Sequence, residues 1–198
     1  MTGFFNLFKQ EGISSTALVN RMKRLTHTPC GHMGTLDPLA EGVLPVGVGR
    51  ATRLFEYFLK KRKRYTARFV FGKTTETLDR ESQPIGEGRV PSEEEIRCVL
   101  GGFIGTIDQV PPAYSAKSVN GKRSYDLARA GKTVKLPPKK VEIISLDLIG
   151  QTGVNEFEFD IVCGGGTYIR SLARDIAASL GTLAYMTKLT RTGSGVFD

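Results

Sequence analysis

The stretch VEIISLDLIGQTGVNEFEFDIVCGGGTYIRSLARDIAASLG, residues 141–181, decides the fold class. Two strand-like runs, Val141 to Ile149 and Phe157 to Cys163, follow one another directly and are predicted to pair. The helix that comes next ends at Gly181, and its apolar stripe consists of Ile169, Leu172, Ala173, Ile176, Ala177 and Leu180. Because strands succeed each other instead of alternating strictly with helices, the pattern favours an α+β fold with a mixed sheet over a doubly wound one.

The rest of the chain supplies further strands and helices. The expected strands are Phe4 to Phe8, Val43 to Val48, Tyr65 to Phe71 and Ala184 to Leu189, and Pro45 predicts an edge or a bulge in the second of them. The first expected helix is capped by Ser14 or Ser15 and has apolar Leu18, Val19, Met22 and Leu25, and the second has apolar Ala51, Leu54, Phe55, Phe58 and Leu59. A third is expected from the capping box Ser92–Glu95 through Leu100, and a fourth from Ser124 to Ala130. No repeat or flexible linker interrupts this order, so a single domain is predicted.

The composition indicates a basic protein. Its 198 residues carry 28 Lys and Arg against 20 Asp and Glu, a net charge of +8 that attracts polyanions such as nucleic acid. Lys60 to Arg64 form a continuous basic run, although such a run is also typical of a solvated helix end. With no membrane-spanning run and no secretory signal, a cytoplasmic protein is expected. Three separated cysteines and two histidines predict neither a disulfide framework nor a metal site.

The Gly-rich segment GHMGTLDPLAEG, Gly31 to Gly42, is the most informative candidate for a functional loop. Pro38 restricts the backbone of Asp37, so the Asp37 carboxylate is presented stiffly. An Asp followed by Pro is also a common turn former, and the residues alone do not separate these two readings.

Two further features carry the same ambiguity. In GGGTYIR, Gly164 to Arg170, the glycines could hold an anion, and Arg170 could pair with a carboxylate or phosphate or lie with Arg174 on a solvated helix face. Tyr65, directly after the basic run, suits either base stacking or the core. Taken alone, these residues indicate a basic protein that contacts RNA or DNA and has a rigid acidic loop.

Five segments, in order, resemble the TruB family of tRNA pseudouridine synthases. They are GHMGTLDPLAEGVLPVGVGRATR (31–53), KRYTARFVFGKTTETLD (63–79), PPAYSAKSVNGKRSYDLARAG (111–131), CGGGTYIRSLARDIAASLG (163–181) and LTRTGSGVF (189–197). The resemblance implies a pseudouridine synthase fold of the α+β class, a mixed, mostly antiparallel sheet flanked by helices. It also implies that the protein isomerises uridine to pseudouridine in RNA without cofactor or metal, with uridine-55 in the TΨC loop of tRNA as the expected target.

The resemblance also assigns roles to individual residues. It makes Asp37 the nucleophile, Arg170 the partner of its carboxylate, and Tyr65 the ring that stacks on the flipped base and helps remove its proton. The residues expected to bind RNA are His32, Leu189, Lys9, Lys63 and Arg64. The expected partner is the TΨC stem-loop of tRNA, with no obligate protein partner.

This chain departs from the family pattern in a few places. Gln10 stands where the family has Pro, and Gly164 and Gly165 replace a commoner Ser-Lys pair. Family members generally continue into a C-terminal RNA-binding domain of the PUA type, whereas this chain stops at Asp198. Residues 1–198 are therefore expected to form one catalytic domain, with the C-terminal domain absent or truncated. Two alternatives remain: a non-catalytic RNA-binding or tRNA-folding protein, and a synthase acting on another RNA, such as the guide-RNA-dependent relatives that act on ribosomal RNA.

Overall fold

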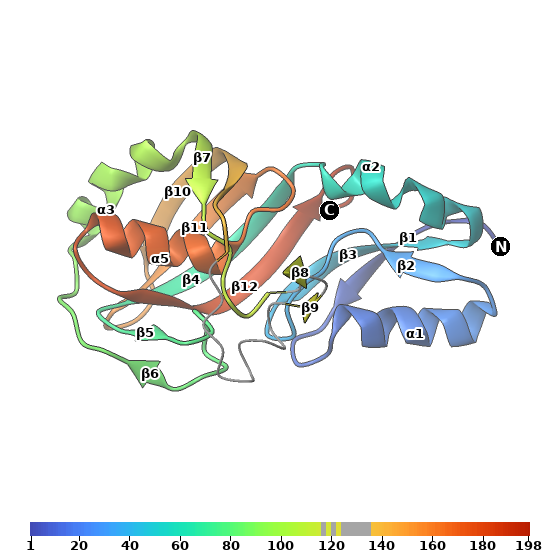
Figure 1. Ribbon diagram of the computed structural model, residues 1–198, viewed down its shortest axis with the longest axis horizontal. Coiled ribbons are helices and arrows are strands. Elements are labelled where there is room, and N and C mark those ends of the chain that lie inside the picture. Colours follow the sequence, from blue (N-terminus) through green and yellow to red (C-terminus); the bar gives the residue numbers. More distant parts are fainter. Residues whose placement is uncertain (116–117, 120–121, 124–135) are drawn as a thin grey trace.

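The computed structural model describes residues 1–115, 118–119, 122–123 and 136–198, and it is built on one long sheet (Figure 1). The sheet has eight strands in the order β1-β3-β12-β4-β11-β10-β7, with β2 paired to β3 off this path. The bounds are β1 Gly3–Lys9, β2 Cys30–His32, β3 Glu41–Val48, β4 Lys63–Phe71, β7 Gly105–Gln109, β10 Lys139–Gln151, β11 Glu156–Cys163 and β12 Ala184–Ser194. β3 and β12 pair in parallel and the other pairs in this sheet are antiparallel, so the predicted α+β fold with a mixed, mostly antiparallel sheet is confirmed.

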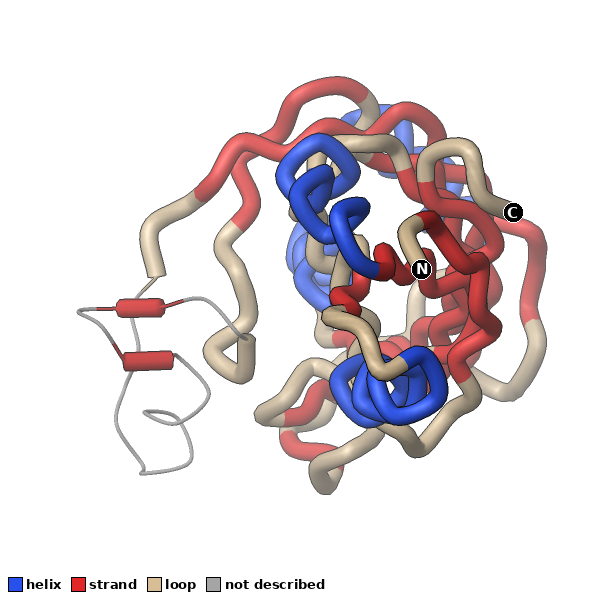
Figure 2. Tube along the Cα trace, turned by 90° about the vertical axis from the view of Figure 1, so that its right-hand side faces the viewer, coloured by secondary structure: helices blue, strands red, loops and turns tan. Residues whose placement is uncertain are grey.

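Helices pack on the inner side of the curved sheet (Figure 2). α5 contacts β4 and β12, α3 contacts β10, and α1 contacts β2. The helix bounds are α1 Ser15–Thr26, α2 Phe55–Leu59, α3 Glu93–Leu100 and α5 Ile169–Ser179, with 3₁₀ helices η1 Gly49–Leu54 and η2 Gly101–Phe103. Two small hairpins complete the described strands, β5 Thr74–Thr75 with β6 Pro84–Ile85 and β8 Ser118–Val119 with β9 Lys122–Arg123. No helix in the described part of the chain is both long and apolar enough to cross a membrane.

The sequence patterns that predicted α1, α3 and α5 are confirmed. The Ser14 hydroxyl accepts a hydrogen bond from the Ala17 backbone at 3.1 Å, and Ser92 and Glu95 form a complete capping box. Along α5 every residue of the predicted apolar stripe is buried. The core lies between this stripe and the central strands, where the rings of Phe69 and Phe159 pack with centroids 4.7 Å apart. This packing fixes the start of α5 relative to β4, the two elements that carry Arg170 and Tyr65.

β3 is an interior strand, so the prediction that Pro45 marks an edge is wrong. β1 pairs along one side of β3 with residues 42–48. On the other side, β2 pairs with residues 46–48 and β12 pairs with residues 41–42. Pro45 lies in the gap between these two partners, where its carbonyl accepts a hydrogen bond from the Met33 backbone at 2.8 Å. A proline without an N–H is tolerated inside the sheet because no continuous strand faces it there.

Other boundaries also differ from expectation. Residues 51–59 form a 3₁₀ helix followed by a short α-helix, and of these residues only Ala51 is buried. Leu25, placed in the apolar stripe of α1, is 72% exposed. β12 continues five residues past the predicted end at Leu189. The helix expected from Ser124 to Ala130 lies outside the described residues.

Candidate active site

The Asp37 loop, residues 33–40, connects β2 to β3 and is fixed to the start of α1. The hydroxyl of Ser15 donates to the Leu36 carbonyl and accepts from the Leu36 N–H, both at 2.9 Å. Within the loop, the Ala40 N–H donates to the Asp37 carbonyl at 3.0 Å. Backbone groups on both sides of Asp37 are therefore held, as the Asp-Pro pair predicted, and the carboxylate stays 35% exposed.

Two buried cations, Lys9 and Arg191, donate hydrogen bonds to backbone carbonyls of the Asp37 loop. The Lys9 ammonium, at the end of β1, donates to the carbonyls of Gln10, Pro38 and Ala40 at 3.0, 3.1 and 2.5 Å. The Arg191 guanidinium, on β12, donates to the carbonyls of Gly34 and Val43 at 3.1 and 2.7 Å. Charged donors make the stronger hydrogen bonds, so these contacts hold the loop carbonyls more firmly than neutral donors would.

Lys9 and Lys63, two of the residues expected to bind RNA, are buried and donate to backbone carbonyls of the protein, so RNA binding by them remains a prediction. Lys9 is fully buried and its ammonium is occupied by the loop carbonyls. Lys63 is 6% exposed and donates to the carbonyls of Leu59 and Lys61 at 3.1 and 2.9 Å. Burial, together with the Arg191 charge, lowers the pKa of Lys63 to about 8. Both lysines donate to backbone carbonyls because Lys9 ends β1 and Lys63 begins β4, where neighbouring segments outside the sheet have free carbonyl groups.

Arg170 is the central charge of the site. Its Nη2 lies 3.0 Å from Oδ2 of Asp37, the pairing that the resemblance implied, and its Nη1 lies 3.2 Å from Oδ2 of Asp79. Its two Nη atoms also donate to the carbonyls of Thr77 and Tyr114 at 2.9 and 3.1 Å. The Arg170 side chain is 7% exposed, so the solvated-face reading is wrong. A guanidinium with four acceptors holds the orientation of the Asp37 carboxylate firmly.

Asp79 completes this network from the loop that follows β5. Its side chain is 2% exposed. Its Oδ1 accepts from the Thr77 hydroxyl at 2.6 Å and from the Glu81 backbone at 3.0 Å, which leaves Oδ2 for Arg170. Burial and the neighbouring Asp79 and Asp37 raise the pKa of Glu81. One cation between two carboxylates leaves the trio with a net negative charge, which Asp37 presents at the surface.

Tyr65 lies in the central strand β4, opposite Arg191 of β12 in the strand register. The ring is buried, and desolvation raises its pKa to about 12, partly offset by Arg191. Tyr65 is therefore a neutral phenol at ordinary pH. Leu189, two residues before Arg191 on β12, is 5% exposed. Both side chains belong to the hydrophobic core.

His32, at the end of β2, leads into the Asp37 loop. Its side chain is partly exposed, but its Nδ1 is buried and has no hydrogen-bond partner among the described residues. Desolvation, followed by the charge of Arg191, lowers the pKa of His32. The imidazole is therefore neutral at pH 7 and offers a lone pair and a flat face.

The basic surface is smaller than the sequence suggests. Arg64 is exposed, yet its guanidinium makes a two-pronged contact with the Asp160 carboxylate at 3.0 and 2.9 Å. Arg174 donates to the carboxylate of Asp175 and to the carbonyl of Val110, each at 2.9 Å. Direct RNA binding by Arg64 remains a prediction that would require this ion pair to be shared or opened.

The glycines before α5 serve close packing. A Cβ at position 165 would lie 1.7 Å from the Leu59 carbonyl oxygen, which only glycine avoids. The Tyr168 N–H at the start of α5 donates to the Gln109 side chain at 2.8 Å. The anion-binding reading of GGGTYIR is therefore not needed to explain its glycines.

Sequence reasoning missed three charged or aromatic residues of the site. Asp79 and Arg191 stand within the quoted motifs but received no role, because a charged residue in a strand or loop is usually solvated. Tyr168 was also overlooked; burial raises its pKa, and the Asp37 charge acts on it in the same direction. A charged residue inside an otherwise apolar alternation, as at Arg191 in β12, was the available signal.

Comparison with known proteins identifies the family of the chain. Residues 22–169 match the family described as TruB family pseudouridylate synthase (N terminal domain). The chain is 46% identical over 198 residues to "tRNA pseudouridine synthase B" of Anaplasma marginale, covering 99% of this chain and 65% of the relative. It is also 46% identical to the protein of the same name from Thermosipho melanesiensis, covering 100% of this chain and 66% of the relative.

A solved structure supports the fold. The chain superposes on a protein in "Crystal Structure of a Cbf5-Nop10-Gar1 Complex" with a TM-score of 0.76 and 31% identity, covering 99% of this chain and 50% of that one. The chain thus spans about two thirds of the curated relatives and half of the structural one. The family match, the sequence identity over nearly the whole chain and the shared fold show that the chain belongs to the TruB family of pseudouridylate synthases, and that the matched region is that family's N-terminal domain.

Proposed function

We propose that this protein isomerises uridine to pseudouridine in RNA, with Asp37 as the nucleophile. The observation that carries the proposal is the Asp37 carboxylate itself: it is 35% exposed and 3.0 Å from a buried arginine, on a loop whose carbonyls are held by two buried cations. A carboxylate is a weak nucleophile unless it is fixed in place, and this arrangement fixes it. The names of the relatives at 46% identity support the same reaction class.

The reaction requires the uridine to leave its stack before Asp37 can reach it. The carboxylate then attacks C6 of the base or C1′ of the sugar, and the N1–C1′ glycosidic bond breaks. The uracil turns in the site and forms a C5–C1′ bond, C5 loses its proton, and N1 gains one. The bond between Asp37 and the substrate breaks in the same sequence, and its electron pair returns to the carboxylate. Arg170, 3.0 Å from the carboxylate, holds it in one orientation while the base lies over it.

Tyr65 and Leu189 are proposed to receive the flipped base. A neutral phenol ring suits stacking, since every base has a π-face. For Tyr65 to accept the C5 proton, its phenolate would have to form beside the Arg191 guanidinium, the one charge that lowers its raised pKa. His32 is proposed to contact the RNA loop from the other end of the Asp37 segment.

The proposed RNA is tRNA and the proposed target is uridine-55 of the TΨC loop. We also propose that the protein acts in the cytoplasm. We propose that it acts without an obligate protein partner. The relatives named for tRNA are 46% identical to this chain, whereas the protein solved with Nop10 and Gar1 is 31% identical.

The test is release of tritium from tRNA labelled at uridine C5, because forming the new C–C bond expels that label. Wild-type protein should release one equivalent from tRNA alone, and tRNA with cytidine at position 55 should release none. Asp37→Asn should lower the rate by at least about 10³-fold. An undiminished rate in Asp37→Asn would show that another group is the nucleophile. Binding of tRNA with no release by the wild type would favour the non-catalytic alternative.

A further inference from the structure

Arg191 is a buried cation whose hydrogen-bond partners in the described part of the chain are all neutral. It is 1% exposed on β12, and its Nε and Nη2 donate to the carbonyls of Val43 and Gly34 at 2.7 and 3.1 Å. A buried charge normally has an oppositely charged partner, because removing an unpaired charge from water is costly. An anion that forms only during the reaction would be such a partner.

The remaining nitrogen of the guanidinium, Nη1, is a donor that is not used. It is buried and has no hydrogen-bond partner among the described residues, although buried polar atoms normally have one. Arg191 stands opposite Tyr65 in the antiparallel register of β12 and β4, so the two buried side chains lie on the same face of the sheet. We propose that Arg191 is a positioning residue of the reaction, whose Nη1 stabilises the phenolate of Tyr65 while Tyr65 carries a proton between atoms of the uracil.

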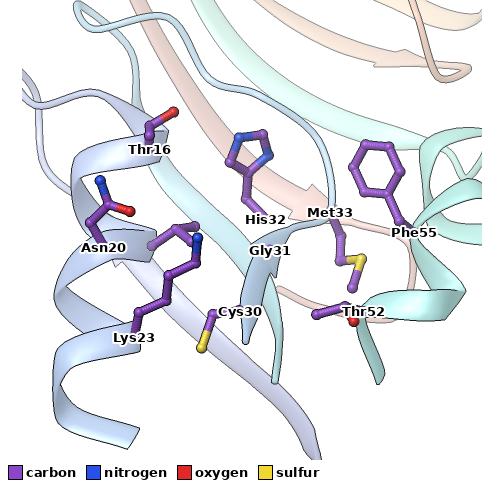
Figure 3. Close-up of a pocket in the computed structure, with 10 residues that line it drawn as sticks. Thr16, Asn20, Lys23, Cys30, Gly31, His32, Met33, Thr52 and Phe55 are labelled. Carbon is purple, nitrogen blue, oxygen red and sulfur yellow. The ribbon is translucent and has the colours of Figure 1, made fainter. Parts of the chain in front are cut away.

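The other groups close to Arg191 supply no anion. Burial, together with the Arg191 charge, lowers the pKa of Lys63 and of His32, which makes His32 a neutral imidazole. Figure 3 shows the His32 ring beside β2, in the hollow between α1 and Phe55. Lys63 donates to two backbone carbonyls. Tyr65 is therefore the neighbour opposite Arg191 that can become an anion.

Arg191 is also the charge that favours ionisation of Tyr65. Desolvation raises the pKa of Tyr65 to about 12, and the charge of Arg191 acts against that rise. Cys163 and Asp37 act in the same direction as desolvation. Without Arg191 the phenol would hold its proton still more firmly, so the proton would be harder to pass on during the reaction.

The proton balance of the reaction suits such a carrier. When the N1–C1′ bond breaks, its electron pair stays on N1, and N1 takes the phenolic proton of Tyr65. The C5–C1′ bond forms next. The phenolate, held by Nη1 of Arg191, then takes the C5 proton, and the electron pair of the C5–H bond returns to the ring. One proton has left C5 and one has reached N1, and Tyr65 is again the neutral phenol that it was at the start.

This inference rests on the proposed function, since it assigns one step of that reaction. The test replaces Tyr65 with 3,5-difluorotyrosine, an analogue of nearly the same shape whose phenol is a stronger acid. Single-turnover tritium release is measured with each side chain in the wild type, in Arg191→Gln and in Lys9→Gln. The relief factor is the rate with difluorotyrosine divided by the rate with tyrosine. A glutamine at position 191 still offers amide donors for the carbonyls of Val43 and Gly34, but it has no charge.

Arg191→Gln should lower the rate about 10- to 100-fold when position 65 is tyrosine, which is part of the contribution of a general base. Difluorotyrosine should recover most of this loss, because the analogue ionises without the help of a cation. Lys9→Gln is the matched control: it removes the other buried cation of the Asp37 loop, whose charge is not among those that shift the pKa of Tyr65. Its relief factor should equal that of the wild type. Equal relief factors in Arg191→Gln and Lys9→Gln would overturn the inference, because Arg191 would then only hold the loop.

A second measurement uses natural side chains alone. In a Tyr65→Phe background, Arg191→Gln should lower the rate by less than about twofold, since the phenol through which Arg191 acts is gone. The same loss in both backgrounds would contradict the inference. Arg191→Lys, which keeps a buried charge but lacks the Nη1 donor, takes the place of Arg191→Gln if thermal unfolding shows that the glutamine variant does not fold. Its relief factor should likewise exceed that of Lys9→Gln, and an equal one would overturn the inference.

The two proposals can fail separately. Tritium release by the wild type with equal relief factors would overturn the role of Arg191 and leave the reaction standing. No tritium release by the wild type would overturn the proposed function, and this proton transfer with it.

Discussion

The Arg170 network makes a sharp prediction for Asp79→Asn. In the wild type, Oδ1 of Asp79 accepts two hydrogen bonds from Thr77 and Glu81, and Oδ2 faces Arg170 at 3.2 Å. The asparagine amide keeps both Oδ1 contacts only if its NH₂ group takes the Oδ2 position. It then points a donor at the guanidinium, so the substitution breaks the ion pair while keeping the shape of the side chain.

The expected cost is large because both partners are buried, with side chains 2% and 7% exposed. Breaking a buried ion pair by removing one partner costs about 3–5 kcal/mol. For a domain of this size that corresponds to a decrease in Tm of about 6–20 °C. Arg170 also loses one of the two carboxylates that hold it, so the Asp37 carboxylate loses its fixed orientation, and the rate of tritium release should fall about 100-fold.

The matched control is Asp160→Asn, which removes the carboxylate of the exposed Arg64–Asp160 pair with its 2.9 and 3.0 Å contacts. Arg64 is 61% exposed, so this pair should contribute at most about 1 kcal/mol. Thermal unfolding by circular dichroism and single-turnover tritium release measure both effects. Equal losses of stability in Asp79→Asn and Asp160→Asn would refute the reasoning from burial, and full activity in Asp79→Asn would refute the positioning role of the network.

Three further predictions test the buried cations and the glycine contact. Lys9→Met should lower the rate of tritium release at least about tenfold, because the loop carbonyls lose their charged donor. The slope of log Kd against log salt should stay unchanged, because a buried lysine releases no counterion from the RNA. A shallower slope would show that Lys9 does contact an RNA phosphate. The pKa of Lys63 is about 8 in the folded protein against 10.5 ordinarily, so the unfolded chain binds more protons between pH 8 and 10. The free energy of unfolding of the wild type, measured by chemical denaturation, should therefore rise with pH over this range relative to that of Lys63→Met. A difference between the two proteins that stays constant with pH would contradict the lowered pKa. Gly165→Ala should lower the free energy of unfolding by about 1–3 kcal/mol or more through the clash with the Leu59 carbonyl, whereas Gly102→Ala, where a Cβ meets nothing within 4 Å, should be nearly neutral; similar Tm values for the two variants would count against that packing.

The elements that carry strong local patterns were predictable from the sequence. The capping box of Ser92 and Glu95 predicts α3, and the helical spacing of apolar residues after Gly166 predicts α5. The succession of Val141 to Ile149 and Phe157 to Cys163 identifies β10 and β11 and, with them, the fold class. These features depend on contacts between near neighbours in the chain, which the order of residue types records directly.

The burial of the charged residues was not predictable in the same way. The position of Arg170 on α5 reads as solvated, because its partners come from segments 56 to 133 residues away in the chain. Lys9 reads as a surface cation at a strand end, since the carbonyls that it holds at Pro38 and Ala40 come 29 and 31 residues later. Nothing local to Arg170 or Lys9 records those partners, so only motifs matched over the whole chain indicated that Asp37 and Arg170 would meet.

The position of β12 has a consequence for the order in which the protein is made. β12 lies between β3 and β4, although it is the last of the strands in the chain, and its Arg191 reaches a carbonyl 157 residues earlier. During synthesis, β1 with β3 and β4 with β10 and β11 emerge as two separate half-sheets, each with an open edge. The sheet closes only when the final strand inserts between them, a slow, long-range step that leaves unpaired edges exposed to aggregation in the meantime. The Asp37 loop therefore lacks the hydrogen bond from Arg191 until β12 has docked between β3 and β4.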